Sequence, residues 1–110
     1  MEKNLEPQVM IHTRNMQLTD TIETYVTKKT AKFIRHLPGI DEIRVDLDHV
    51  RTARNAADRN VAQITIHGKK FLLRAEERAE DLYAAIDATI DKMDRQIRRF
   101  KGKRYDKRAG

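Results

Sequence analysis

The sequence predicts an α+β fold of order βαβββα, in which a four-stranded sheet carries two helices packed on one face. Three observations predict this fold. Four segments show the two-residue alternation of half-buried strands, two segments show the helical period, and Pro38-Gly39 separates the first helix from the second strand. At 110 residues the chain is long enough for one domain and too short for two ordinary ones.

The first strand is expected at residues 8–15, where Val9, Ile11 and Thr13 alternate with Met10, His12 and Arg14. Thr19 or Asp20 then offers a helix N-cap, because both side chains can accept hydrogen bonds from free backbone amides. The helix should end at Pro38-Gly39, since proline cannot continue a helix and glycine suits the position after its last turn.

The second strand is expected at residues 40–50, with Ile43, Val45 and Leu47 facing the core and Arg44, Asp46 and Asp48 facing solvent. Residues 50–60 contain three arginines and no bulky apolar residue after Val50, so we expect a mobile loop. Residues 61–67 and 70–75 should form a hairpin across Gly68-Lys69, because this spacing suits a tight turn with glycine first.

The last helix should begin near Glu80 and end at about Phe100. Its apolar residues recur in steps of four and three, as on one side of a helix. They are Leu82, Ile86, Ile90, Met93, Ile97 and Phe100. We therefore expect one domain over residues 8–101, with flexible tails at 1–7 and 102–110.

Positive charge is concentrated near the C-terminus. Residues 92–108 contain nine Lys or Arg and two Asp, whereas the rest of the chain has 14 basic and 15 acidic side chains. Favourable contact with the helix dipole, about a few tenths of a kcal/mol for each cation, accounts for two or three of the nine. The excess favours a polyanionic partner, and a solvated charged face stays the alternative.

A helical wheel separates these charges from the apolar stripe. On the last helix, Lys92, Arg95 and Arg99 lie on one flank, and Asp87, Asp91 and Asp94 lie on the other with Arg98. On the first helix, Lys28, Lys32 and Arg35 lie on the same-handed flank, with Lys29 near its boundary. Two helices on one sheet face would then join their cations into one surface.

The sequence offers little for catalysis or for metal binding. It has no cysteine, and its four histidines, His12, His36, His49 and His67, lack the spacing of a helical zinc site. All four glycines are isolated, so no phosphate-binding loop is predicted. We expect a protein that is not an enzyme and binds no metal or cofactor. A ribonuclease using His12 and His67 stays an alternative, although no spacing brings the two together.

No apolar run approaches the roughly 20 residues that span a bilayer, so we expect a cytoplasmic protein that does not contact membranes.

Two segments carry a resemblance to a known family. They are LTDTIETYVTKKTAKF at residues 18–33 and LRAEERAEDLYAAIDATIDKMDRQIRRFKGK at residues 73–103. Together they resemble the ribosome hibernation-promoting factors, also called protein Y, ribosome-associated inhibitor or light-repressed protein. The resemblance covers roughly residues 9–103. DLYAAID followed by DKMDRQIRRFK is its most specific part.

The resemblance implies the βαβββα fold. The exposed strand face of Arg44, Asp46 and Asp48 is charged and should resist self-association, so we expect a monomer. Family members bind the small ribosomal subunit where mRNA and tRNA otherwise lie, and they inhibit translation in starved cells. By the same resemblance, the rRNA-binding residues are Lys28, Lys29, Lys32, Arg35, Lys92, Arg95, Arg98, Arg99 and Lys101. Long members continue into a second domain that pairs ribosomes. The resemblance leaves open whether this chain is a short form or the N-terminal domain of a long one.

The expected fold is also similar to that of double-stranded RNA-binding domains, whose last helix begins with a basic cluster. Here the corresponding segment is acidic, with Glu76, Glu77, Glu80 and Asp81, so RNA would have to bind differently. A general RNA-binding or RNA-chaperone domain that acts off the ribosome stays the alternative function.

Overall fold

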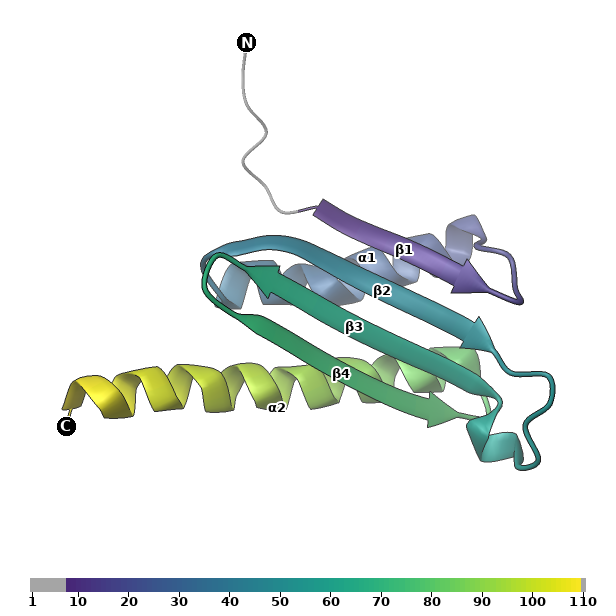
Figure 1. Cartoon of the computed structure of the whole chain (residues 1–110). Helices are drawn as coiled ribbons and strands as arrows, with labels where there is room; N and C mark the ends of the chain where they lie inside the picture. The colour runs from purple at the N-terminus through teal and green to yellow at the C-terminus, as the bar shows by residue number, and fades with distance from the viewer. Residues whose placement is uncertain (1–7, 110) are drawn as a thin grey trace, which may run out of the picture.

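The structure is a computed structural model that describes residues 8–109, with side chains described as far as residue 102. One sheet and two helices form two layers (Figure 1). The elements are β1 (Gln8–Arg14), α1 (Asp20–His36), β2 (Ile40–His49), a short 3-10 helix (Ala56–Asp58), β3 (Asn60–Gly68), β4 (Leu72–Ala79) and α2 (Leu82–Ala109). The predicted α+β order is confirmed.

The strands lie in the order β1-β2-β3-β4. β1 pairs parallel with β2 because α1 connects them, whereas β2, β3 and β4 pair antiparallel. One row of the covered face runs from Ile11 through Val45 and Ile64 to Ala75. Both helices cover this face, and their buried residues complete the core: Ile22, Val26, Phe33, Ala85, Ile86, Ile90, Met93 and Ile97.

Local signals explain the ends of α1. The Thr19 hydroxyl accepts a 3.2 Å hydrogen bond from the Ile22 amide, so Thr19 is the N-cap. At the other end, Leu37 is the C-cap and Gly39 has a φ of 86°, which a residue with a side chain rarely adopts. The predicted stop at Pro38-Gly39 is confirmed.

The β3–β4 hairpin is confirmed, but the reason given for its glycine was wrong. Gly68 is the last residue of β3, and its amide donates a 2.9 Å hydrogen bond to the Phe71 carbonyl. A Cβ on Gly68 would lie 2.1 Å from the nearest carbon of the Phe71 ring. Glycine is therefore needed here for close packing, not as the first residue of the turn.

α2 is longer than expected, since it continues from Phe100 to Ala109. A glycine inside a helix costs about 1 kcal/mol relative to alanine, and Gly102 is flanked by lysines, which favour helix. The expected tail at residues 1–7 lies outside the described residues, whereas 102–109 belongs to α2.

The segment from 50 to 60 is irregular, as predicted, but it contains a 3-10 turn and ends in a buried asparagine. The Asn60 side chain donates a 2.7 Å hydrogen bond to the Glu80 carbonyl. It also lies 3.1 Å from the His49 imidazole. These contacts tie the end of the loop to the start of α2, and the alternation pattern gave no sign of them.

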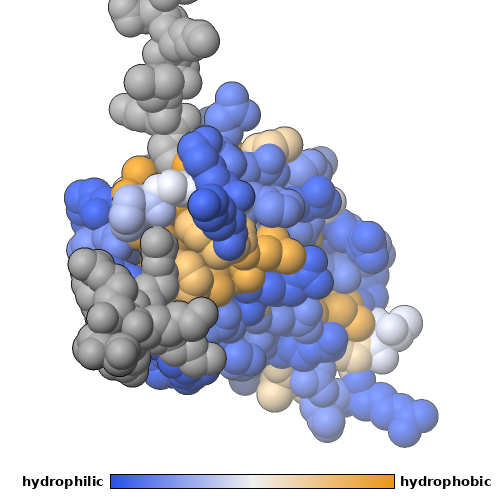
Figure 2. Space-filling model, turned by 60° about the vertical axis from the view of Figure 1, so that its left-hand side comes forward, coloured by the Kyte–Doolittle hydropathy of each residue, from blue (hydrophilic) through white to orange (hydrophobic). Residues whose placement is uncertain are grey.

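Figure 2 shows the end of the molecule that carries the β3–β4 turn, where hydrophilic residues surround a hydrophobic patch. At this end the rings of Phe71 and Phe100 lie 5.1 Å apart, and both are partly buried. Neither α1 nor α2 covers the opposite face of the sheet, and the described residues contain no other long helix (Figure 1). Arg44 is exposed there, as expected.

Candidate nucleic-acid interface

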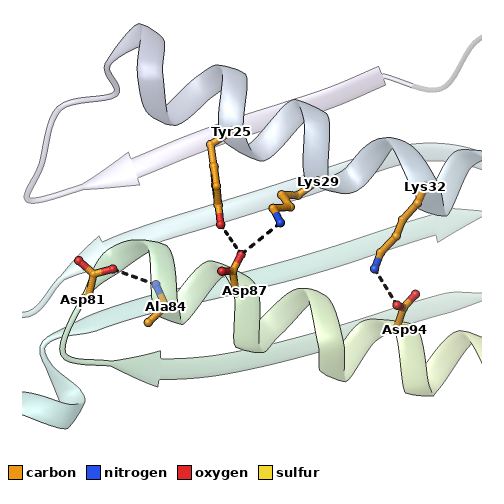
Figure 3. A network of polar contacts seen from close by, with 7 residues as sticks. All are labelled: Tyr25, Lys29, Lys32, Asp81, Ala84, Asp87 and Asp94. Carbon is orange, nitrogen blue, oxygen red and sulfur yellow. Dashed lines mark hydrogen bonds and ion pairs between the residues drawn. The ribbon is translucent and has the colours of Figure 1, made fainter.

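α1 and α2 run parallel and in register. The Tyr25 hydroxyl donates a 2.6 Å hydrogen bond to Asp87, and the Lys32 ammonium donates one of 2.7 Å to Asp94 (Figure 3). Both contacts join residues that are 62 positions apart, so each step along α1 is matched by an equal step along α2. The C-termini of the two helices consequently lie at the same end of the sheet (Figure 1).

The middle turns of the two helices bring opposite charges together. Lys29 lies 4.0 Å from Asp87, and Lys32 lies 2.7 Å from Asp94. The expectation that the basic flanks of both helices adjoin is therefore wrong here. On parallel helices, same-handed flanks point in the same direction, so the basic flank of α1 meets the acidic flank of α2.

One turn beyond the Lys32–Asp94 pair, both helices carry basic residues. α1 ends with Arg35 and His36, and the corresponding turn of α2 carries Arg98 and Lys101. The Lys101 ammonium donates a 2.9 Å hydrogen bond to the His36 carbonyl. A cation at this position offsets the partial negative charge at the C-terminus of α1. We call Arg35, His36, Arg98, Arg99 and Lys101 the basic end.

Lys92 lies on the other side of α2, toward the edge strand β4. Its ammonium is 3.3 Å from Glu77 and donates a 3.3 Å hydrogen bond to the Glu76 carbonyl. The neighbouring Gln96 donates a 2.7 Å hydrogen bond to the Arg74 carbonyl. Side chains on this flank of α2 therefore donate hydrogen bonds to backbone carbonyls of β4, and the Lys92 ammonium is held at the edge of the sheet by its contacts with Glu76 and Glu77.

The nine predicted rRNA-binding residues fall into two groups. Lys29, Lys32, Lys92 and Lys101 contact a carboxylate or a carbonyl within the protein. Lys28, Arg35, Arg95, Arg98 and Arg99 are exposed and form no ion pair with any residue that the structure describes. The second group is free to bind an external anion. Arg35 lies on the last turn of α1, and Arg95, Arg98 and Arg99 lie in the middle of α2.

Sequence reasoning missed the tyrosine pair between the helices. Tyr25 and Tyr83 pack edge to face with ring centroids 4.9 Å apart, and Lys29 lies 5.3 Å from the Tyr25 ring centroid. The hydrogen bond to Asp87, together with partial burial, raises the pKa of Tyr25 to about 12. This phenol therefore stays protonated at neutral pH and acts as a donor. The helical spacing of Tyr25 from Lys29 and Lys32 was the sequence signal that could have placed Tyr25 on the side of α1 that faces α2.

The uncovered sheet face has a hollow of about 550 Å³, lined by His12, Arg14, Arg44, Asp46, Asp48, Gln63, Glu76 and Arg78 among others. Its charges are of both signs, and Arg44 pairs with Asp46 at 3.1 Å. This balance suits a polyanion less well than the basic end does.

Within the part of the chain that the structure describes, no three His, Asp or Glu side chains gather as metal ligands. None of the helices there is long and apolar enough to cross a membrane.

Both the sequence and the fold are similar to those of known proteins. The sequence model of the family described as sigma 54 modulation protein / S30EA ribosomal protein matches residues 9–105. A "Ribosome hibernation promotion factor" from Picosynechococcus sp. is 34% identical over 93% of this chain and 53% of its own length. A protein of the same name from Deinococcus radiodurans is 38% identical over 80% of this chain and 46% of its own length. The chain thus spans about half the length of these curated relatives.

Among solved structures, the N-terminal domain of protein Y from Thermus thermophilus is similar, with a TM-score of 0.70 and 34% identity. The match covers 83% of this chain and 94% of that domain.

Proposed function

The chain belongs to the sigma 54 modulation protein / S30EA ribosomal protein family, and we propose from this that it is a ribosome hibernation factor. In this proposal it binds rRNA of the small ribosomal subunit in the path of mRNA and tRNA. Occupying that path inhibits translation under stress or in stationary phase. The protein acts as a monomer in the cytoplasm, by binding and not by catalysis.

The observation that carries the proposal is the basic end of the parallel helices. Arg35, Arg98 and Arg99 are exposed and free of ion pairs with the described residues. Arginine suits RNA because its planar guanidinium can bind a phosphate through two hydrogen bonds. Each phosphate that a cation neutralises also releases counterions, which favours binding at low salt.

The outward sides of both helices are accessible to a partner, because the sheet packs only against their apolar sides. Their apolar sides are buried against β1 to β4, so the outward sides carry little besides charged and small residues. rRNA that contacts the helices needs no opening of the fold. This supports binding as a rigid body, in which few side chains lose freedom apart from the arginines themselves.

The test is cosedimentation of the pure chain with purified small subunits, with and without bound mRNA and tRNA. We expect the chain to sediment with empty subunits and to be displaced by mRNA with tRNA. A parallel titration with unstructured RNA separates this function from that of a general RNA-binding or RNA-chaperone domain. Equal affinity for unstructured RNA and subunits, or sedimentation that mRNA and tRNA do not reduce, would contradict the proposal.

A further inference from the structure

Two lysines of α1 are already engaged by carboxylates of α2. Lys32 donates to Asp94 at 2.7 Å, and Lys29 lies 4.0 Å from Asp87 (Figure 3). Asp87 is fixed in addition by the hydrogen bond from Tyr25. The two carboxylates thus occupy positions that an RNA phosphate would need in order to use these lysines.

The Lys32–Asp94 pair is the stronger of the two. Its side chains are 32% and 28% exposed, against 44% and 48% for Lys29 and Asp87. Partial burial reduces screening by water and salt, so the shorter pair persists under conditions in which exposed pairs contribute little. Asp94 has no other hydrogen-bond partner among the described residues, so its effect on Lys32 can be isolated.

We infer that Asp94, together with Asp87, is a specificity-determining residue that withholds Lys32 and Lys29 from non-specific RNA. A phosphate that approaches Lys32 meets a carboxylate beside the ammonium, so attraction and repulsion largely cancel. RNA that fits only the middle of the helices therefore gains little from these two lysines.

The basic end distinguishes a specific RNA partner from non-specific RNA. A partner that also contacts Arg35 and Arg98 holds its phosphates in place through those contacts, and it can then replace the Asp94 carboxylate at Lys32. The identity of that partner rests on the proposed function. The effect of Asp94 on Lys32 does not rest on it, because binding to any single-stranded RNA can be used to measure that effect.

Asp91 offers a matched control. It lies on α2 between Asp87 and Asp94, is exposed, and forms no ion pair with the described residues. Asp94→Asn and Asp91→Asn change the net charge by the same amount. Only Asp94→Asn frees Lys32, so any difference between the variants reports the local pair and not the overall charge.

The experiment is a fluorescence titration of each variant with poly(U) at several salt concentrations. One more phosphate contact with a single strand steepens the logarithmic salt slope by about 0.7, equivalent to about fivefold tighter binding at 0.1 M salt. We expect this gain for Asp94→Asn relative to Asp91→Asn, and its loss in Asp94→Asn/Lys32→Gln. Equal slopes for the two single variants, or a gain that survives in the double variant, would overturn the inference.

Asp94→Ser is measured alongside, so that the result does not depend on one replacement, and circular dichroism confirms that each variant is folded. With purified small subunits, Asp94→Asn should gain less than it gains with poly(U). An equal gain for both would refute the specificity role. If the unmodified chain fails to bind subunits, the proposed function fails, whereas the poly(U) comparison still decides whether Asp94 withholds Lys32.

Discussion

The Tyr25 hydroxyl reaches from α1 to Asp87 on α2 and donates a 2.6 Å hydrogen bond to its carboxylate. The bond joins a neutral donor to a charged acceptor, which makes it stronger than a hydrogen bond between neutral groups. Asp81 and Tyr83 lie close enough to disfavour a phenolate further. The contact between the two helices therefore depends on a protonated Tyr25.

This contact predicts a loss of stability at high pH. The pKa of Tyr25 rises from 10.0 in the unfolded chain to about 12 in the folded protein. Its stabilising effect is fully present below pH 10 and is lost as pH rises through about 12, because the unfolded state releases its proton first. Thermal melts across this range should show a smaller decline for Tyr25→Phe than for the unmodified protein. Parallel declines would mean that the bond does not form.

Charge reversal of the free arginines should disrupt ribosome binding without unfolding the protein. We expect Arg95→Glu/Arg99→Glu to reduce the logarithmic salt slope of subunit binding by about 2, one unit for each lost phosphate contact. Its free energy of unfolding should change by less than about 1 kcal/mol, because both side chains are exposed.

The control for this variant is Arg51→Glu/Arg54→Glu, which changes the net charge equally on the β2–β3 loop. It should reduce affinity less and leave the slope closer to that of the unmodified chain. A loss of the same size for both variants would show that net charge, and not the helical surface, controls binding. Asp87 is unsuitable as a neutral control because it holds Tyr25 and Lys29.

Substitutions in the core should act through the fold alone. Phe33 is fully buried under α1, and Ile90 is 3% exposed under α2. We expect Phe33→Ala and Ile90→Ala to lower the free energy of unfolding by roughly 2 to 5 kcal/mol each, because cavities remain. Leu72→Ala, at a site 55% exposed, should cost far less. Denaturant titrations measure all three, and full stability of either core variant would contradict the packing.

Two glycines should respond to alanine in opposite ways. At Gly68 the added methyl group would collide with the Phe71 ring, which would have to leave its contact with Phe100, at a cost of about 1 to 3 kcal/mol. At Gly102 the added carbon would meet no other described part of the protein within 4 Å outside the local helix, so alanine should stabilise α2 by up to about 1 kcal/mol. Melting temperatures that shift in the same direction would disprove this contrast.

The elements of the fold were predictable because their signals are local. The alternation of Ile43, Val45 and Leu47 with polar residues indicates β2, and Pro38-Gly39 ends α1 independently of any tertiary contact. The buried Asn60 was not predictable, since its partners are a histidine before the loop and a carbonyl 20 residues later. Tertiary hydrogen bonds of this kind leave no periodic trace in the sequence.

The candidate site was predictable only in part. The wheel separated the basic and acidic flanks of each helix correctly, but it says nothing of which flank faces the neighbouring helix. The missing information was helix direction: a parallel arrangement places Lys32 against Asp94, whereas the prediction had joined cations to cations. It remains a prediction that the nine residues bind rRNA.

The strand order of the sheet equals the strand order of the chain. Each strand can therefore pair with the strand synthesised just before it, whereas α1 meets its partner residues on α2 only 62 residues later. α2 is made after all four strands, and it closes the core over β3 and β4 with Ile86, Ile90 and Met93. The same helix carries Arg95, Arg98 and Arg99. A nascent chain thus completes its core and its cationic surface in one step, so a chain that still lacks α2 has neither a closed core nor most of the exposed arginines of the two helices.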